Sequence, residues 1–169
     1  MNKLVLFCVE STPQADTDTL YIQETLEHFY VRSSKITIRF VHMKSKTRYN
    51  SKTVREEIKR RSMYFEDITV IYCVDTDDYD ISSDSNELLN KIREHCESNN
   101  YEFIFFCKDI EDVYWGQKVQ KTKKISEAGR FRSSKSIEKV NEKLLQRGQY
   151  KAHCSNILNV LDRYFTRKH

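Results

Sequence analysis

The segment Ile68-Thr-Val-Ile-Tyr-Cys-Val74 is followed at once by the polar stretch Asp75-Thr-Asp-Asp78. Its β-branched and aromatic residues, bounded by polar sequence, are typical of a strand that is buried on both faces. Other runs rich in apolar residues precede and follow it along the chain, and the one at 36–43 partly alternates between apolar and polar residues. These further predicted strands span residues 4–9, 36–43 and 103–107.

Segments with apolar residues at helical spacing separate these strands. They span residues 17–30, 52–65 and 84–98. Strands that alternate with helices, and that are apolar throughout, are joined by right-handed crossovers in a sheet covered on both sides. The sequence therefore predicts the α/β class, with a four-stranded, mainly parallel sheet and helices on both faces.

The pattern changes after residue 108. A short segment at 109–115 leads into a polar, basic stretch, and two helices are expected at about 134–146 and 152–166. We therefore expect an α/β domain over residues 1–116. Residues 117–169 are expected to form a basic linker and a C-terminal helical pair packed on the same domain.

The composition excludes several functional classes. The chain has 169 residues but only three glycines, Gly116, Gly129 and Gly148, so neither a Walker loop nor a dinucleotide fingerprint can follow the first strand. No apolar run approaches the roughly 18 residues that a membrane span needs. The five cysteines form no C-x-x-C pair, which favours buried reduced thiols. These features predict a cytoplasmic protein without a membrane partner.

Carboxylates follow three of the four predicted strands. Glu10 follows the first, Asp75 and Asp77 follow the third, and Glu111 lies just past the fourth. Ligands bind outside the carboxyl ends of strands in an open parallel sheet, so we expect these side chains to meet at one edge. Oxygen ligands of this kind suit Mg²⁺ or Mn²⁺. The sequence therefore predicts a divalent metal site at this edge.

Other interpretations stay open for the acidic loop at residues 75–87, which follows the third predicted strand. Its carboxylates could be solvated and cap the helix that starts near Asp84. A phosphorylated receiver domain would also place Asp75 at the end of its third strand, but it requires an acidic pair where only Glu10 stands. An EF-hand loop that starts at Asp75 is excluded. It would need glycine at its sixth position and glutamate at its twelfth, where this chain has Asp80 and Asn86.

Basic residues gather in two runs, at 44–61 and 118–135. Basic stretches beside an acidic centre are typical of an enzyme that holds a phosphate backbone while a metal acts on one phosphate. A solvated basic face is the alternative for either run. The residues expected to contact nucleic acid are Arg55, Lys59, Lys118, Lys121, Lys123, Lys124, Arg130 and Arg132.

At its strand ends the chain resembles a Toprim domain, which has a glutamate after the first strand and an Asp-x-Asp after the third. Here these are Phe7-Cys-Val-Glu10 and Tyr72-Cys-Val-Asp-Thr-Asp-Asp78. It is most similar to the RloB-like and OLD-nuclease branch, which opens with a pattern like V-E-G-x-T-E-x-x-Y-F. The chain has Val9-Glu-Ser11, an insertion, and then Thr17-Asp-Thr-Leu-Tyr-Ile22, so Asp18 matches the second acid. Asp109-Ile-Glu-Asp-Val-Tyr-Trp115 resembles the branch motif P-x-F-E-x-W-L, and the likeness covers about residues 3–115.

The resemblance implies a metal-dependent nuclease that hydrolyses phosphodiester bonds in DNA or RNA, in phage defence or a mobile element. Glu10, Asp75 and Asp77 would be the catalytic residues and the metal ligands. The alternative is a non-catalytic Toprim-like module that binds nucleic acid or regulates a partner protein; homodimer formation stays open. The carboxylates expected in a second metal site or an outer shell are Asp18, Asp78 and Glu111.

Overall fold

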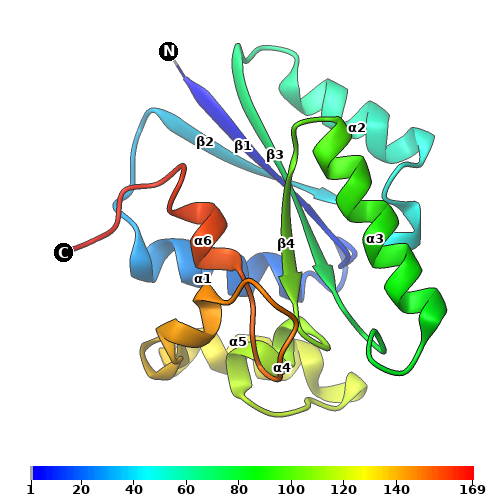
Figure 1. Cartoon of the computed structure of the whole chain (residues 1–169). Helices are drawn as coiled ribbons and strands as arrows, with labels where there is room; N and C mark the ends of the chain where they lie inside the picture. The colour runs from blue at the N-terminus through cyan, green and yellow to red at the C-terminus, as the bar shows by residue number, and fades with distance from the viewer. Residues whose placement is uncertain (1) are drawn as a thin grey trace.

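The computed structural model describes residues 2–169 and contains one sheet of four parallel strands (Figure 1). The strand order is β2-β1-β3-β4, and each neighbouring pair runs in the same direction. The predicted α/β class and parallel sheet are therefore confirmed, and the sheet is parallel throughout. The strands are β1 (Lys3–Val9), β2 (Ile36–His42), β3 (Asp67–Asp75) and β4 (Glu102–Phe106).

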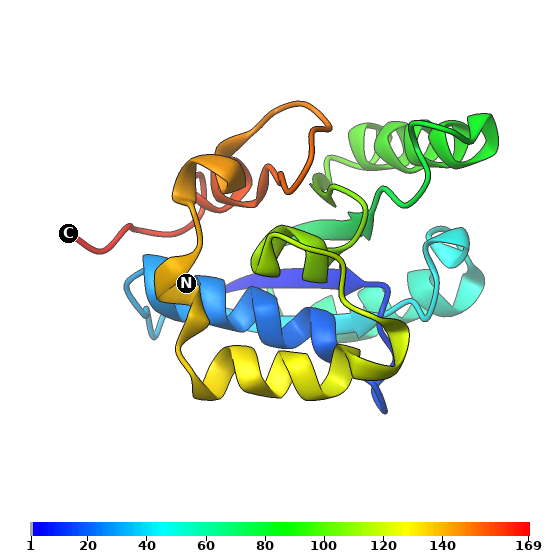
Figure 2. The ribbon, with the colours of Figure 1, turned by 90° about the horizontal axis from the view of Figure 1, so that it is seen from below.

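Helices cover both faces of the sheet, as predicted. In β1, Val5 and Phe7 point into the core beneath one set of helices, and Leu4 and Leu6 point into the core beneath the other. This alternation follows from the two-residue period of a strand. Figure 2 shows α1 and α5 side by side on one side of the sheet and α3 on the other. One face carries α1 (Thr17–Phe29), α4 (Ile110–Trp115), α5 (Lys124–Ser133) and α6 (Ile157–Leu161), and the other α2 (Lys52–Ser62) and α3 (Ser83–Ser98).

The helices start at residues with suitable capping side chains. The hydroxyl of Ser51 accepts a hydrogen bond from the backbone N–H of Val54 and starts α2. Ser82 does the same for α3, so Asp84 lies in its first turn and is not its cap. Asp109 caps α4, which ends at Gly116 in the left-handed conformation, with φ 69°.

The C-terminal third differs from the expected helical pair. The helix predicted at 134–146 is wrong: Lys135 has a φ of 52° and Val140 is extended, so only 3₁₀ turns form at Ser136–Lys139 and Glu142–Gln146. The helix predicted at 152–166 shortens to α6. A helix that the sequence did not predict, α5, lies where the basic linker was expected.

Residues 2–169 contain no helix long and apolar enough to cross a membrane. All five cysteines in this part of the chain are buried and free of disulfides, as the sequence predicted.

The outer edge of β4 is sealed by side chains from the segment before α6. The amide nitrogen of Asn156 donates to the Phe103 carbonyl at 2.9 Å, and its amide oxygen accepts from the Phe105 N–H at 3.0 Å. The hydroxyl of Ser155 donates to the Phe105 carbonyl at 2.6 Å. These bonds take the place of pairing with a further strand, because they satisfy backbone groups that an edge strand leaves unpaired.

Replacing Asn156 by alanine should lower the free energy of unfolding by about 2 kcal/mol, because two part-buried backbone groups of β4 lose their partners. Urea denaturation followed by circular dichroism measures this change. Asn159→Ala is the matched control, since the Asn159 amide makes one exposed bond to the Gln146 carbonyl. A loss equal to that of the control would show that the Asn156 bonds do not support the edge.

Candidate functional site

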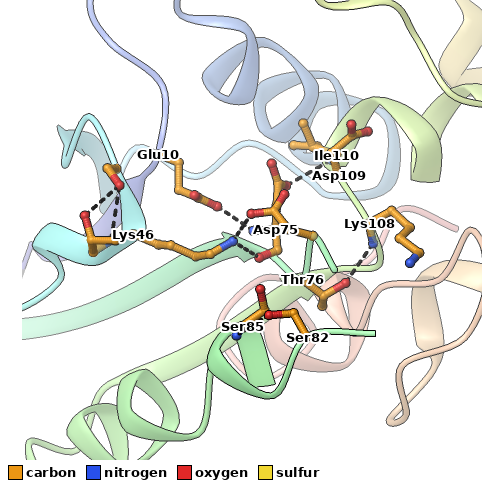
Figure 3. A network of polar contacts seen from close by, with 12 residues as sticks. Glu10, Lys46, Asp75, Thr76, Ser82, Ser85, Lys108, Asp109 and Ile110 are labelled. Carbon is orange, nitrogen blue, oxygen red and sulfur yellow. Dashed lines mark hydrogen bonds and ion pairs between the residues drawn. The ribbon is translucent and has the colours of Figure 1, made fainter. Parts of the chain in front are cut away.

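The carboxyl ends of β1 and β3 form the centre of the site. These strands are neighbours, and the chain leaves them in opposite directions along the sheet, which is the switch point where ligands bind in such folds. Glu10 follows β1, Asp75 is the last residue of β3, and Glu10 Oε2 accepts a hydrogen bond from the Asp75 N–H at 2.5 Å. Figure 3 shows Glu10 pointing toward Asp75. The structure thus brings together two residues that the sequence assigned to one site.

The Asp75 carboxylate is partly buried between the sheet and the start of α4. Its Oδ1 accepts a hydrogen bond from the Ile110 N–H at 3.0 Å. Burial, together with the nearby carboxylates of Glu10, Asp18 and Glu111, raises the pKa of Asp75 well above its usual range. Four carboxylates from separate parts of the chain therefore act on one another at this place, which we call the carboxylate cluster (Glu10, Asp18, Asp75 and Glu111).

Asp18 enters the carboxylate cluster from the first turn of α1. Its Oδ2 accepts from the Ser11 N–H at 3.1 Å, and burial together with Glu10 and Glu111 raises its pKa to about 7. The loop before α1 is pinned by Asp16, whose carboxylate accepts from the Ser11 hydroxyl at 2.9 Å and lies 2.8 Å from His42 Nε2. The loop therefore keeps Asp18 beside the other acids.

Glu111 has an oxygen without a hydrogen bond. The residue is 2% exposed, and burial raises its pKa while Lys124 opposes that rise. Its Oε1 accepts from the Thr17 hydroxyl at 3.4 Å. Its Oε2 is buried and lies 3.1 Å from Lys124 Nζ, in a direction that makes an ion pair but no hydrogen bond. This oxygen therefore has an ion-pair partner but receives no hydrogen bond.

The remaining predicted metal ligands lie at the rim. Asp77 has a φ of 47°, donates its N–H to the Lys108 carbonyl at 2.9 Å, and forms an ion pair with Lys46. Its side chain is about half exposed. Asp78 is exposed and takes no part in the contacts of the carboxylate cluster.

Two lysines flank the acids. Lys46, in the 3₁₀ turn Lys46–Arg48 after β2, is only 6% exposed and donates from Nζ to the Asp75 carbonyl at 2.8 Å. Lys124 pairs with Glu111 and Asp109. The sequence placed Lys124 at the nucleic-acid surface and did not single out Lys46. The sequence analysis inspected only the acidic residues that follow the strands. The same inspection of the basic residues that follow β2 would have identified Lys46.

The other predicted nucleic-acid contacts divide into two groups. Arg130 pairs with Glu127 and Arg132 with Glu24, so both are engaged within the protein. The remainder are exposed and make no ion pair within residues 2–169. They are Arg55 and Lys59 on α2, and Lys118, Lys121 and Lys123 between α4 and α5.

No three His, Cys, Asp or Glu side chains in residues 2–169 form a ready-made metal site. Backbone N–H groups bond to carboxylate oxygens of Glu10, Asp18 and Asp75, and the ammonium groups of Lys46 and Lys124 form ion pairs with Asp77 and Glu111. The donor set nevertheless fits a hard divalent cation. All its atoms are oxygens, the carboxylates repel one another, and Glu111 Oε2 lacks a donor.

Comparison of the chain with protein-family models, curated proteins and solved structures finds no match. The Toprim resemblance therefore stays a prediction.

Proposed function

We propose that the protein is a Toprim-like, metal-dependent phosphodiester hydrolase that cleaves DNA or RNA. The observation that carries this proposal is the convergence of Glu10, Asp18, Asp75 and Glu111 at the switch point of a parallel sheet. Burying repelling carboxylates costs stability, and proteins concentrate such arrangements at functional sites.

Glu10, Asp75 and Asp77 would hold Mg²⁺ or Mn²⁺, which neutralises charge on a phosphoryl oxygen and lowers the pKa of water. Glu111 and Asp18 are contributed by α4 and α1 and raise the pKa of Asp75. Their carboxylates would orient groups that approach the phosphate. The Ile110 N–H fixes the direction of the Asp75 carboxyl, which keeps the ligand set in place.

Lys118, Lys121 and Lys123 would hold the nucleic-acid backbone. They lie in the exposed segment between Glu111 and Lys124, both of which take part in the site. Exposed lysines without internal partners can neutralise phosphates at little cost. Arg55 and Lys59 lie on the helix that covers the opposite face of the sheet and would contact a longer substrate.

The second candidate is a non-catalytic Toprim-like module that binds nucleic acid and acts with a partner protein. One observation favours it: Lys46 and Lys124 already neutralise part of the acidic charge, as they would in a site that has no need of a metal. A receiver-like switch is disfavoured, because one oxygen of the Asp75 carboxyl is bonded to the Ile110 N–H and only Glu10 follows β1, where a receiver has an acidic pair.

Incubation of the purified protein with plasmid, single-stranded DNA and total RNA tests the proposal. Gel electrophoresis should show cleavage of at least one substrate with Mg²⁺ or Mn²⁺ and none with EDTA. Calorimetry with Mn²⁺ is run beside it. A protein that binds nucleic acid but leaves every substrate intact with either cation would contradict the hydrolase and favour the partner-dependent module.

A further inference from the structure

The ammonium group of Lys46 lies among the acids where a metal ion would be expected. Its Nζ donates to the Asp75 carbonyl at 2.8 Å and forms an ion pair with the Asp77 carboxylate. Lys46 is also the charge that most strongly lowers the pKa of Glu10, against the effect of burial. In Figure 3 the side chains of Lys46 and Glu10 both point toward Asp75. One ammonium therefore contacts the Asp77 carboxylate and the Asp75 backbone, and acts electrostatically on Glu10.

The backbone after β2 fixes this position. The Met43 N–H donates to the Val9 carbonyl at 2.8 Å and extends the β1–β2 pairing past the end of the strand. Lys44 then adopts a left-handed conformation, with φ 70°, and the Ser45 hydroxyl caps the following turn. A lysine with a φ above zero carries backbone strain, so the turn that directs Lys46 inward is maintained against a local cost.

We propose that Lys46 is a tethered cation, which occupies a position beside Asp77 and the Asp75 carbonyl that the divalent ion would need, and leaves it when that ion binds. The inference rests on the proposed function, since it requires a metal at Glu10, Asp75 and Asp77. An ammonium and a divalent cation that contact the same carboxylates repel each other, so binding of the ion favours the exit of Lys46. The flexible stem of lysine allows the exit, and exposed neighbours Lys44 and Arg48 show that solvent adjoins the turn.

Displacement changes the surface that a nucleic acid meets. The freed ammonium would join Lys44 and Arg48 at the rim of the site, so cation binding would add a positive charge to the phosphate-binding surface. The metal-free protein, in contrast, keeps that charge buried.

Lysine reactivity measured by mass spectrometry tests the displacement directly. The wild-type protein is acylated briefly with acetic anhydride in EDTA and in increasing Mg²⁺. The labelling rate of Lys46 should rise about tenfold with the cation, because a protected group reacts only from the open state. Lys44, exposed in the same loop, is the internal control and should keep its rate.

Calorimetry on the same samples separates the two proposals. Cation binding without a change in Lys46 labelling would overturn the tethered cation and leave the metal site standing. Absence of cation binding would overturn both the metal site and the tethered cation.

A substitution gives an independent measurement. Lys46→Met should bind Mn²⁺ about tenfold more tightly than wild type, because the internal competitor has been removed. Lys108→Met is the matched control: Lys108 is an exposed lysine that pairs with Asp80, and its removal should leave the affinity unchanged. Equal or weaker binding by Lys46→Met than by Lys108→Met would overturn the proposal.

Discussion

Replacing Asp75 by asparagine should abolish cation-dependent cleavage and at the same time stabilise the metal-free protein. Loss of a central ligand removes several kcal/mol of transition-state stabilisation, so the rate should fall by about a thousandfold or more. Asparagine keeps an oxygen for the Ile110 N–H, and it removes the charge that Glu10, Asp18 and Glu111 repel. The free energy of unfolding in EDTA should therefore rise by about 2 kcal/mol.

Initial cleavage rates and urea denaturation measure the two effects of Asp75→Asn. Asp78→Asn is the matched control, because Asp78 is an exposed carboxylate three residues away in the same loop. This control should cleave at the wild-type rate, with a stability change within about 0.5 kcal/mol. Cleavage that survives Asp75→Asn would show that another part of the chain carries the activity.

The metal-free protein should lose stability as the pH rises from about 5 to about 8. Burial and mutual repulsion raise the pKa of Glu10 to about 6 and that of Asp18 to about 7. The folded state therefore binds more protons than the unfolded state in this range, and each deprotonation disfavours folding. The stability present at low pH is lost as the pH passes through these raised pKa values.

Asp18→Asn should remove part of this dependence and raise the free energy of unfolding at pH 8 by about 3 kcal/mol. Urea denaturation in EDTA across the pH series measures the slope, and Asp84→Asn on the surface of α3 is the control. Mg²⁺ should restore stability at high pH by neutralising the acids. A stability that rises with pH in EDTA would show that the cluster ionises without repulsion.

Sequence patterns predicted the elements that depend mainly on residues close together in the chain. The strands β1, β3 and β4 each contain a run of apolar residues, and the hydroxyl of Ser51 marks the start of α2. The meeting of Glu10 and Asp75 could also be predicted, because it follows from strand direction and the position of each residue at a strand end.

The rest depended on contacts between distant residues. The basic segment at 124–133 is helical because Ala128 and Phe131 pack on the face that carries α1, whereas its other residues suggested a linker. The backbone before α6 is irregular because its side chains bond to β4, about 50 residues earlier in the chain. The inward direction of Lys46 depends on the strained turn at Lys44, which composition does not reveal.

The seal on β4 also has a consequence for synthesis on the ribosome. Residues 155–156 are made 50 residues after Phe106, the end of β4. At about 5–20 residues per second, this delay is roughly 3 to 10 s. During that time the nascent sheet has an open edge that could pair with another chain. Chaperone binding to the nascent chain would matter most in this interval, and it would end when Asn156 reaches the strand.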